Sequence, residues 1–361
     1  MELLESILRE GVARTASDIH LKIGSYPVYR VRGTLIPWDD APRLDRDAMV
    51  MLTQGLLSES QCTSLHKNLQ VDAGYGHPEL GRFRVNVFYQ RGELQAALRL
   101  IPPRVRQIRE LNLPPIIERI AGERRGLVLV TGTTGSGKST TLAAIIDHVN
   151  RSVDRHIITV EDPIEYVHSN KESLVNQREI PAHSGSFANA LRSVLRQDPD
   201  VILVGEMRDQ ETIGTALTAA ETGHLVFATL HTQDAPQTVD RIIDVFPPEQ
   251  QGQVRAQLAI GLQGIVTQTL LPTADGQGRC VAAEVLVPTP GVRNLIREGK
   301  THQIYSLIQT GGAHGMQTMD SALAGLVRMQ QITMAAAESR SSNPEELRKL
   351  VHQGFELGAA A

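Results

Sequence analysis

A glycine-rich loop between a strand and a helix constrains the fold of this chain more than any other sequence feature. The apolar run at 127–130 has the length and composition of a buried strand. After the loop, Leu142, Ile145, Ile146 and Val149 recur at helical spacing. The loop itself comprises Gly132, Thr133, Thr134, Gly135, Ser136, Gly137, Lys138, Ser139 and Thr140. A strand, a glycine loop and a helix in this order predict a phosphate-binding loop in an α/β domain.

This loop predicts binding of a nucleoside triphosphate. Glycines let the backbone turn its N–H groups around a phosphate, and the helix N-terminus adds a partial positive charge. Lys138 can reach the β- and γ-phosphates, and the Ser139 hydroxyl can ligate Mg²⁺. A glycine-rich turn before an ordinary helix is the alternative, but it does not account for all the fixed positions of the motif. We therefore expect ATP and Mg²⁺ as ligands.

Length and composition limit the class of protein. A chain of 361 residues with 41% hydrophobic and 21% charged residues suits two globular domains. The net charge of −4 gives no drive towards nucleic acid, so we expect no nucleic-acid partner. No apolar run approaches the ~18 residues of a membrane span, and acids occupy the N-terminus, where a signal peptide would be basic. We expect a cytoplasmic protein. Cys62 and Cys280 cannot form a four-cysteine zinc site.

The chain changes character near residue 101. Residues 1–101 mix helical patterns with alternating stretches at 82–89 and 94–101, which predicts a small α+β domain. Prolines over 102–115 predict a semi-rigid linker, with a surface loop inside one domain as the alternative. Over 116–361, strands alternate with helices, which predicts a parallel-rich sheet covered on both faces and then a helical C-terminal region. The expected strands are 127–130, 157–160, 201–204 and 225–230.

Acids follow two of these strands. Glu206 follows the strand at 201–204 and Gly205, so it should lie at the carboxyl edge of the sheet, where ligands bind. We expect it to orient or deprotonate the attacking water; the alternative is a surface glutamate after a buried strand. Glu161 and Glu165 follow the strand at 157–160 and can position metal-bound waters or the nucleophile. The alternative there is a solvated acidic turn.

Two histidines flank the strand at 225–230. His231 should lie near Glu206, where it could sense the γ-phosphate, although a histidine at a strand end is often structural. His224 precedes the strand. Their spacing of seven residues across one strand is not typical of a metal site.

Arginines are candidates for charge stabilisation between subunits. Arg82 and Arg84 share one face of a strand, and Arg99 lies on another strand. An arginine supplied by a neighbouring subunit can stabilise charge on the γ-phosphate, while a solvated surface charge is the alternative. Arg208 lies in the region of alternating strands and helices, two residues after Glu206.

Together these motifs resemble the type IV pilus retraction ATPases, the PilT or twitching-motility family of secretion ATPases. The resemblance extends from Ser17 to about Asp320. It rests on the phosphate loop and on motifs at 158–166, 205–209, 223–232, 291–298, 309–312 and 315–320. The element at 291–298 departs from the usual family form, because Gly291-Val292 replaces Ala-Ile. Extra N-terminal domains and a four-cysteine zinc module, found in assembly and type II secretion relatives, are missing, which favours retraction.

The resemblance implies a PAS-like N-terminal domain, a RecA-like ATPase domain and a homo-hexameric ring at the inner membrane. It implies ATP sites between the two domains, completed by a neighbouring subunit, and action on an inner-membrane pilus platform protein. It assigns phosphate and Mg²⁺ to Lys138 and Ser139, and catalysis to Glu206. It places Glu161 and Glu165 in an acidic box and His224 and His231 in a histidine box, and it makes Arg82, Arg84 and Arg99 candidate trans arginines.

Other functions remain open at this stage. The chain could be an accessory retraction paralogue working beside a primary motor, or an assembly or secretion ATPase. From other classes, it could be a nucleotide-gated scaffold, which would bind ATP without turnover. A nucleic-acid translocase would show DNA-stimulated hydrolysis, which neither the acidic charge nor the 4% aromatic content favours.

Overall fold

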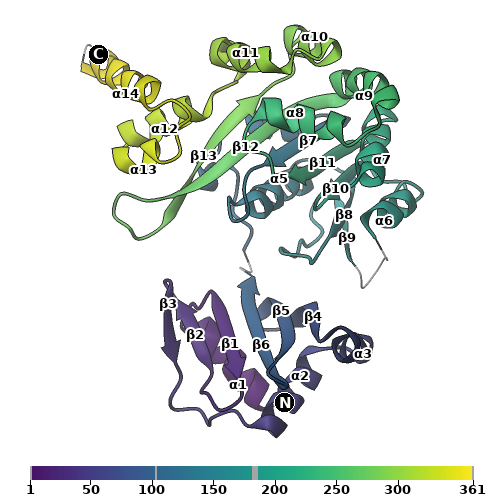
Figure 1. Ribbon diagram of the computed structural model, residues 1–361, viewed down its shortest axis with the longest axis vertical. Coiled ribbons are helices and arrows are strands. Elements are labelled where there is room, and N and C mark those ends of the chain that lie inside the picture. Colours follow the sequence, from purple (N-terminus) through teal and green to yellow (C-terminus); the bar gives the residue numbers. More distant parts are fainter. Residues whose placement is uncertain (1, 102–103, 181–185, 360–361) are drawn as a thin grey trace. The chain divides into compact units, whose positions relative to one another are not determined.

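The computed structural model, which describes residues 2–101, 104–180 and 186–359, divides into two compact units (Figure 1). The first unit extends to Arg104 and includes Pro163–Val167. The second unit holds Val105–Asp162 and the chain from His168 onward. Of the predicted linker, residues 102 and 103 lie outside the described part. Ile108 and Leu113, later in that stretch, are buried in the core of the second unit.

The first unit is built on a six-stranded sheet in the order β3-β2-β1-β6-β5-β4, in which all neighbours are antiparallel. Its strands are β1 (Asp18–Lys22), β2 (Val28–Val31), β3 (Thr34–Pro37), β4 (Gln70–His77), β5 (Gly81–Gln90) and β6 (Glu93–Ile101). Its helices are α1 (Glu2–Ala13), α2 (Arg46–Leu56) and α3 (Glu59–Asn68).

Alternation along β5 decides which side chains enter the core of this unit. Phe83, Val85 and Val87 are fully buried, while Arg82 and Arg84 lie on the opposite face of the strand. The two arginines therefore share a face, as their spacing predicted.

The second unit contains a seven-stranded sheet in the order β13-β12-β7-β11-β10-β8-β9. All neighbouring pairs are parallel except β12 and β13. The strands are β7 (Gly126–Thr131), β8 (His156–Glu161), β9 (Leu174–Glu179), β10 (Val201–Val204), β11 (Leu225–Leu230), β12 (Leu262–Pro272) and β13 (Arg279–Leu286). The helices are α4 (Ile116–Ala121), α5 (Lys138–Ser152), α6 (Phe187–Val194), α7 (Gln210–Glu221), α8 (Ala235–Asp244), α9 (Pro248–Gly261), α10 (Pro290–Glu298), α11 (Ile304–Thr310), α12 (Met319–Arg328), α13 (Met334–Glu338) and α14 (Pro344–Ala359).

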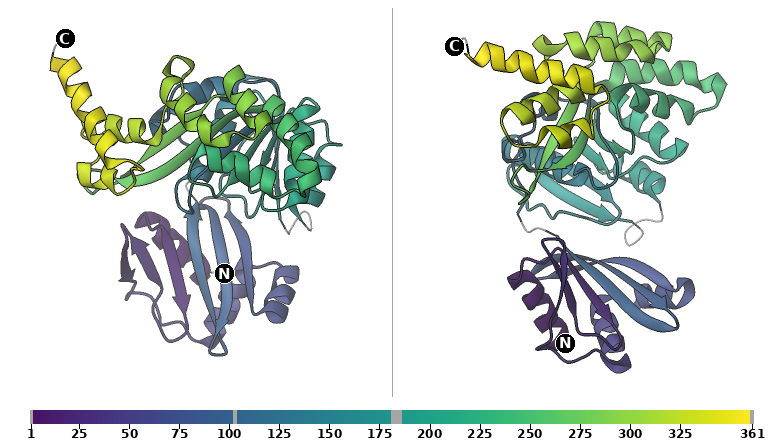
Figure 2. Two further views of the ribbon diagram at one scale, coloured as in Figure 1. Left: turned by 45° about the horizontal axis from the view of Figure 1, so that its top comes forward. Right: turned by 60° about the vertical axis from the view of Figure 1, so that its left-hand side comes forward.

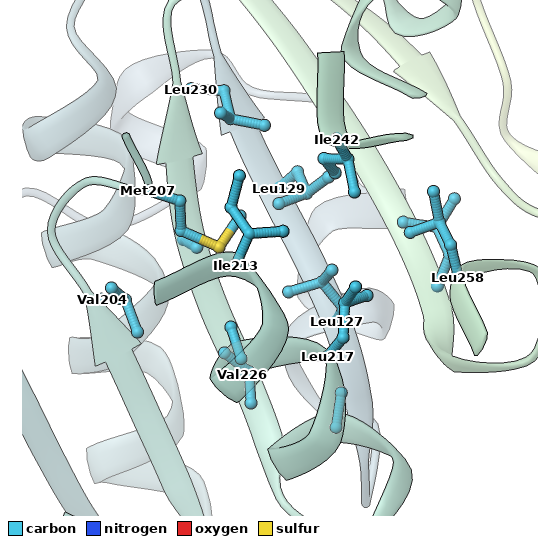
Figure 3. Packing of buried hydrophobic residues seen from close by; sticks show 14 of the residues in the cluster. Leu127, Leu129, Val204, Met207, Ile213, Leu217, Val226, Leu230, Ile242 and Leu258 are labelled. Atoms are coloured by element: carbon cyan, nitrogen blue, oxygen red, sulfur yellow. The ribbon is translucent and has the colours of Figure 1, made fainter. Parts of the chain in front are cut away.

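Two hydrophobic cores cover the two faces of this sheet. Successive residues of β7 point to opposite faces, so Leu127 and Leu129 enter one core and Val128 and Val130 the other. Figure 3 shows Leu127 and Leu129 among side chains that include Leu217, Ile242 and Leu258, from α7, α8 and α9. The other core receives α4 and α5. Burial on both faces explains why the central strands are continuous apolar runs.

The hairpin of β12 and β13 extends the sheet beyond β7 and carries the C-terminal helices. Leu271 and Ala282 of the hairpin pack with Leu323, Leu347 and others from α12, α13 and α14 in a separate cluster. Figure 2 shows these helices gathered at the end of the long hairpin. The sequence patterns predicted neither strand of this hairpin.

The predicted fold class is confirmed: an N-terminal antiparallel sheet domain precedes a mostly parallel mixed sheet flanked by helices. The four strands expected at 127–130, 157–160, 201–204 and 225–230 are all present. None of the helices in the described part of the chain combines the length and apolar content needed to span a bilayer.

Candidate active site

The phosphate loop joins the carboxyl end of β7 to α5, and three glycines determine its path. Gly132, Gly135 and Gly137 have φ values of 138°, 80° and 92°, in the region that favours glycine. At Gly132 the space for a side chain is also filled, because an added Cβ would lie 2.3 Å from the backbone oxygen of Gln268. Backbone conformation and close packing both explain why this loop is rich in glycine.

Lys138 is the first residue of α5 and is 9% exposed. Its Nζ donates hydrogen bonds to the backbone oxygens of Gly132 (2.8 Å) and Thr133 (3.0 Å), which holds the ammonium group against the loop. Gly137 caps the helix without a side chain, and the helix N-terminus adds a partial positive charge that favours an anion. Ser139 is exposed on the same first turn.

The parallel strands bring Glu206 to the same edge of the sheet as the loop. β10 pairs with β11, which pairs with β7, and all three end at this edge. Two hydrogen bonds hold the turn after β10: the Thr229 hydroxyl donates to the Gly205 oxygen (2.5 Å), and the Met207 N–H donates to the Thr229 oxygen (3.1 Å). Met207 is buried in the core, so Glu206 stands between two anchored residues.

Glu206 has two basic neighbours. Nε of Arg208 donates a hydrogen bond to Oε1 of Glu206 (2.5 Å), and Nε2 of His231 lies 3.1 Å from the same oxygen. Burial raises the pKa of Glu206, but Arg208, His231 and Lys138 together lower it more, so its pKa lies below the usual value. The carboxyl group is therefore held ionised near neutral pH, as a base requires.

The two acids of the acidic box have different surroundings. Glu161, at the end of β8, accepts hydrogen bonds from the Thr159 hydroxyl (2.6 Å) and from Nε2 of Gln177 (3.2 Å). Glu165 belongs to the first unit, where its carboxylate lies 3.8 Å from the guanidinium of Arg84.

The remaining predicted residues are spread over both units. His224 precedes β11, at the sheet edge opposite to His231, and its Nδ1 contacts the backbone oxygen of Ala219 at 3.0 Å. In the first unit, Nε of Arg82 donates to the backbone oxygen of Ile164 (3.3 Å). Nε of Arg99 donates to Oδ1 of Asp18 (2.9 Å). The structure therefore brings His231, but not His224, to Glu206.

Two buried polar residues escaped the sequence analysis. Gln268, on β12, is 2% exposed and donates from Nε2 to the backbone oxygen of Ser136 (2.8 Å) in the phosphate loop. Glu284, on β13, is 3% exposed and accepts a hydrogen bond from the Ala235 N–H (2.9 Å) at the start of α8. Both could have been noticed in the sequence as polar residues within mostly apolar runs. Such a pattern does not indicate which groups the residue contacts.

The loop fits a nucleoside triphosphate. Its glycine cradle, the helix N-terminus of α5 and the Lys138 ammonium all favour an anion, and the exposed Ser139 hydroxyl is a hard oxygen ligand suited to Mg²⁺. Over residues 2–101, 104–180 and 186–359, no group of three or more His, Cys, Asp or Glu side chains is arranged to hold a metal ion. A Mg²⁺ ion held mostly by phosphate and water does not need such a group.

Comparisons with known proteins agree with this geometry. A family model described as type II/IV secretion system protein matches residues 79–334. A twitching motility protein of Neisseria gonorrhoeae is 49% identical over 342 residues, covering 95% of this chain and 91% of the relative. The type IV pilus retraction ATPase PilT of Pseudomonas aeruginosa is 47% identical over 344 residues, covering 95% of this chain and 98% of the relative. A crystal structure of the pilus retraction motor PilT with bound ADP superposes with a TM-score of 0.89 at 49% identity, covering 96% of this chain and 98% of that one.

A phosphate loop on a mostly parallel sheet, with an acid at a nearby strand end, defines an α/β nucleoside triphosphatase. The family model matches most of the chain, and both relatives match it over almost its full length. The chain belongs to the type II/IV secretion ATPase family, which confirms the predicted membership.

Proposed function

We propose that this protein is an ATPase motor that powers retraction of type IV pili. One observation carries the proposal: the phosphate loop and Glu206 meet at one sheet edge in a chain that matches a retraction ATPase over 95% of its length. The retraction-type element at 291–298, which forms α10, supports the same assignment.

The loop residues hold the phosphates of ATP in this proposal. Gly132 to Thr140 supply the glycine cradle and the N–H groups at the start of α5, and Lys138 neutralises charge on the β- and γ-phosphates. Ser139 would hold Mg²⁺, which when bound would supply further charge neutralisation at the phosphates.

Glu206 is the proposed general base. Its carboxylate orients a water molecule for attack on the γ-phosphate and accepts the proton that the water loses, while the bond from the γ-phosphorus to the bridging oxygen breaks and ADP leaves. Arg208 and His231 keep that carboxylate ionised and fix its orientation. Glu161 and Glu165 would position water around a bound metal ion, and His224 contributes as a structural member of the histidine box.

The motor is proposed to be a homo-hexamer on the cytoplasmic side of the inner membrane. In this scheme residues 1–101 form the N-terminal domain, 102–115 the linker and 116–361 the ATPase domain. Arg82, Arg84 or Arg99 of one subunit stabilises charge on the γ-phosphate of its neighbour. Hydrolysis at successive subunits acts on an inner-membrane platform protein, and pilin subunits leave the fibre.

Substitution of Lys138 tests the enzymatic part of the proposal. Lys138→Ala should abolish ATP turnover, because the variant loses the charge that faces the β- and γ-phosphates. Lys300→Ala is a matched control, since it removes only an exposed ion pair with Glu298. Turnover in the Lys138→Ala variant equal to that of the control would contradict the proposed site.

Deletion of the gene in its host tests the direction of the motor. Loss of a retraction motor should leave cells with extra surface pili and no twitching motility. Cells without pili would instead indicate an assembly ATPase. Complementation with the Lys138→Ala variant should fail, while the Lys300→Ala variant should restore motility.

A further inference from the structure

Gln268 lies directly beneath the phosphate loop, although it is about 130 residues away from the loop in the sequence. It belongs to β12, which runs parallel to β7, and the neighbouring Thr267 pairs with Thr131 at the end of β7. The hydroxyls of those two threonines are 2.9 Å apart. This register places Gln268, the next residue of β12, beside the start of the phosphate loop.

The loop rests on both the main chain and the side chain of Gln268. An added Cβ at Gly132 would lie 2.3 Å from the backbone oxygen of Gln268, and one at Gly137 would lie 3.1 Å from its Nε2. At the centre of the loop, Nε2 donates to the backbone oxygen of Ser136 at 2.8 Å. The loop therefore meets Gln268 at its first residue, Gly132, and again at its centre, at Ser136 and Gly137.

The chemistry of this contact fixes the orientation of the amide. A backbone carbonyl oxygen can only accept, so the group facing Ser136 must be the NH₂ of Gln268. The other amide atom, Oε1, is buried and has no hydrogen-bond partner among the described residues. An unpaired buried acceptor is unfavourable. The fold tolerates this cost at Oε1 and keeps the hydrogen bond from Nε2 to Ser136.

Peptide geometry extends this contact into the binding site. In a trans peptide unit the carbonyl of Ser136 and the N–H of Gly137 point in opposite directions. A carbonyl held towards Gln268 therefore aims the Gly137 N–H away from β12, towards the side of the loop that receives an anion.

We propose that Gln268 is a positioning residue for the phosphate loop: by holding the Ser136 carbonyl, it orients the loop N–H groups towards the phosphates of the nucleotide. The inference rests on the proposed ATPase function. Gln268 acts only through the loop, so it contributes to nucleotide affinity rather than to the chemical step.

Gln268→Met tests the hydrogen bond with little change in side-chain volume. We expect the Kd and KM for ATP to rise about tenfold, the effect of one lost hydrogen bond, while kcat at saturating ATP changes less than about threefold. Gln263→Met is the matched control, because Gln263 lies on the same strand and donates to the Arg125 backbone oxygen (3.2 Å) far from the loop. That variant should bind ATP as the wild type does.

Gln268→Glu gives a second readout that a purely structural role would not produce. A protonated carboxyl group can donate to the Ser136 oxygen, whereas an ionised one repels both this oxygen and the phosphates. The ATP affinity of Gln268→Glu relative to the wild type should therefore improve as the pH falls. The relative affinity of Gln268→Met should not change with pH.

The outcomes separate this inference from the proposed function. A wild-type protein that binds no ATP overturns both. If the wild type binds ATP and both variants bind it equally well, only the role of Gln268 is overturned. A loss of kcat and of thermal stability in Gln268→Met, with an unchanged KM, also contradicts a positioning role. Should Gln268→Met fail to fold by circular dichroism, the pH dependence of Gln268→Glu decides alone.

Discussion

Nε2 of His231 lies 3.1 Å from Oε1 of Glu206, the same oxygen that accepts the hydrogen bond from Arg208. The histidine follows β11 and the arginine follows β10, so two adjacent strand ends converge on one carboxylate. The arrangement orients Glu206 and keeps its carboxyl group ionised.

Glu206→Gln should bind ATP but lose turnover. The amide keeps the shape of the carboxylate but cannot accept the proton from water, so we expect kcat to fall at least ~10²-fold, or about 2.7 kcal/mol in the barrier. Steady-state hydrolysis and nucleotide titration measure the two effects separately. Near-normal turnover would remove Glu206 from the role of base.

Arg208→Ala should shift the pH dependence of turnover. Arg208 lowers the pKa of Glu206, and the carboxylate must be ionised to act as a base. Without the arginine, the pKa of Glu206 rises and the acid limb of the kcat profile moves to higher pH. Arg192→Ala, which removes an exposed pair with Glu211, is the control and should leave the profile in place. An identical acid limb in all three proteins would argue against this coupling.

Glu284→Gln should change how stability depends on pH. Burial raises the pKa of Glu284 to about 7, with Asp234 and Asp320 adding to the effect against the N–H groups of Ala235 and Met319. Because the folded pKa exceeds the ordinary value, the contribution of Glu284 to the free energy of unfolding is full below about pH 4.5 and is lost as pH rises through about 7. The stability of the wild type relative to the variant should fall by roughly 3 kcal/mol over this window.

Urea unfolding of both proteins between pH 4.5 and 7.5 measures that difference. Glu221→Gln, on the exposed surface of α7, is the control. The difference in free energy of unfolding between this variant and the wild type should stay constant across the pH range. A constant difference between wild type and Glu284→Gln would show that Glu284 does not titrate in this range.

In the proposed ring, mixing of variants tests whether an arginine acts between subunits. Arg84→Ala and Glu206→Gln should each be inactive alone. When the two are mixed and reassembled, some interfaces combine an intact Glu206 with an intact Arg84 from the neighbour, so turnover should return. A mixture of Lys138→Ala with Glu206→Gln is the control. Lys138 and Glu206 both serve the site of their own subunit, so every subunit in this mixture carries a defective site. Equal activity in the two mixtures would exclude Arg84 as a trans residue, and Arg82 and Arg99 can be tested in the same way.

Much of the site could be predicted because its parts are local. The phosphate loop is one continuous segment, and the strand before Glu206 is apolar throughout, so its carboxyl end was clear from the sequence. The contact of His231 with Glu206 also followed, since adjacent parallel strands end at a common edge. His224 and His231 lie apart because they flank the two ends of the same strand, β11.

The hairpin of β12 and β13 was not predictable in the same way. β12 mixes Gln263, Thr267 and Gln268 with apolar residues, so it shows neither the alternation of a half-exposed strand nor a continuous apolar run. Its position beside β7 depends on a pairing between segments far apart in the chain, which local periodicity does not encode.

The sequence by itself determined the class of this protein, because the phosphate loop, the apolar strands and the acids that follow them are properties of short segments. The tertiary structure decided which distant side chains support those segments. Gln268 lies under the loop, and Glu284 at the start of α8, only because strand pairing and burial bring them there. Such contacts arise from packing the whole sheet, so no single stretch of residues specifies them.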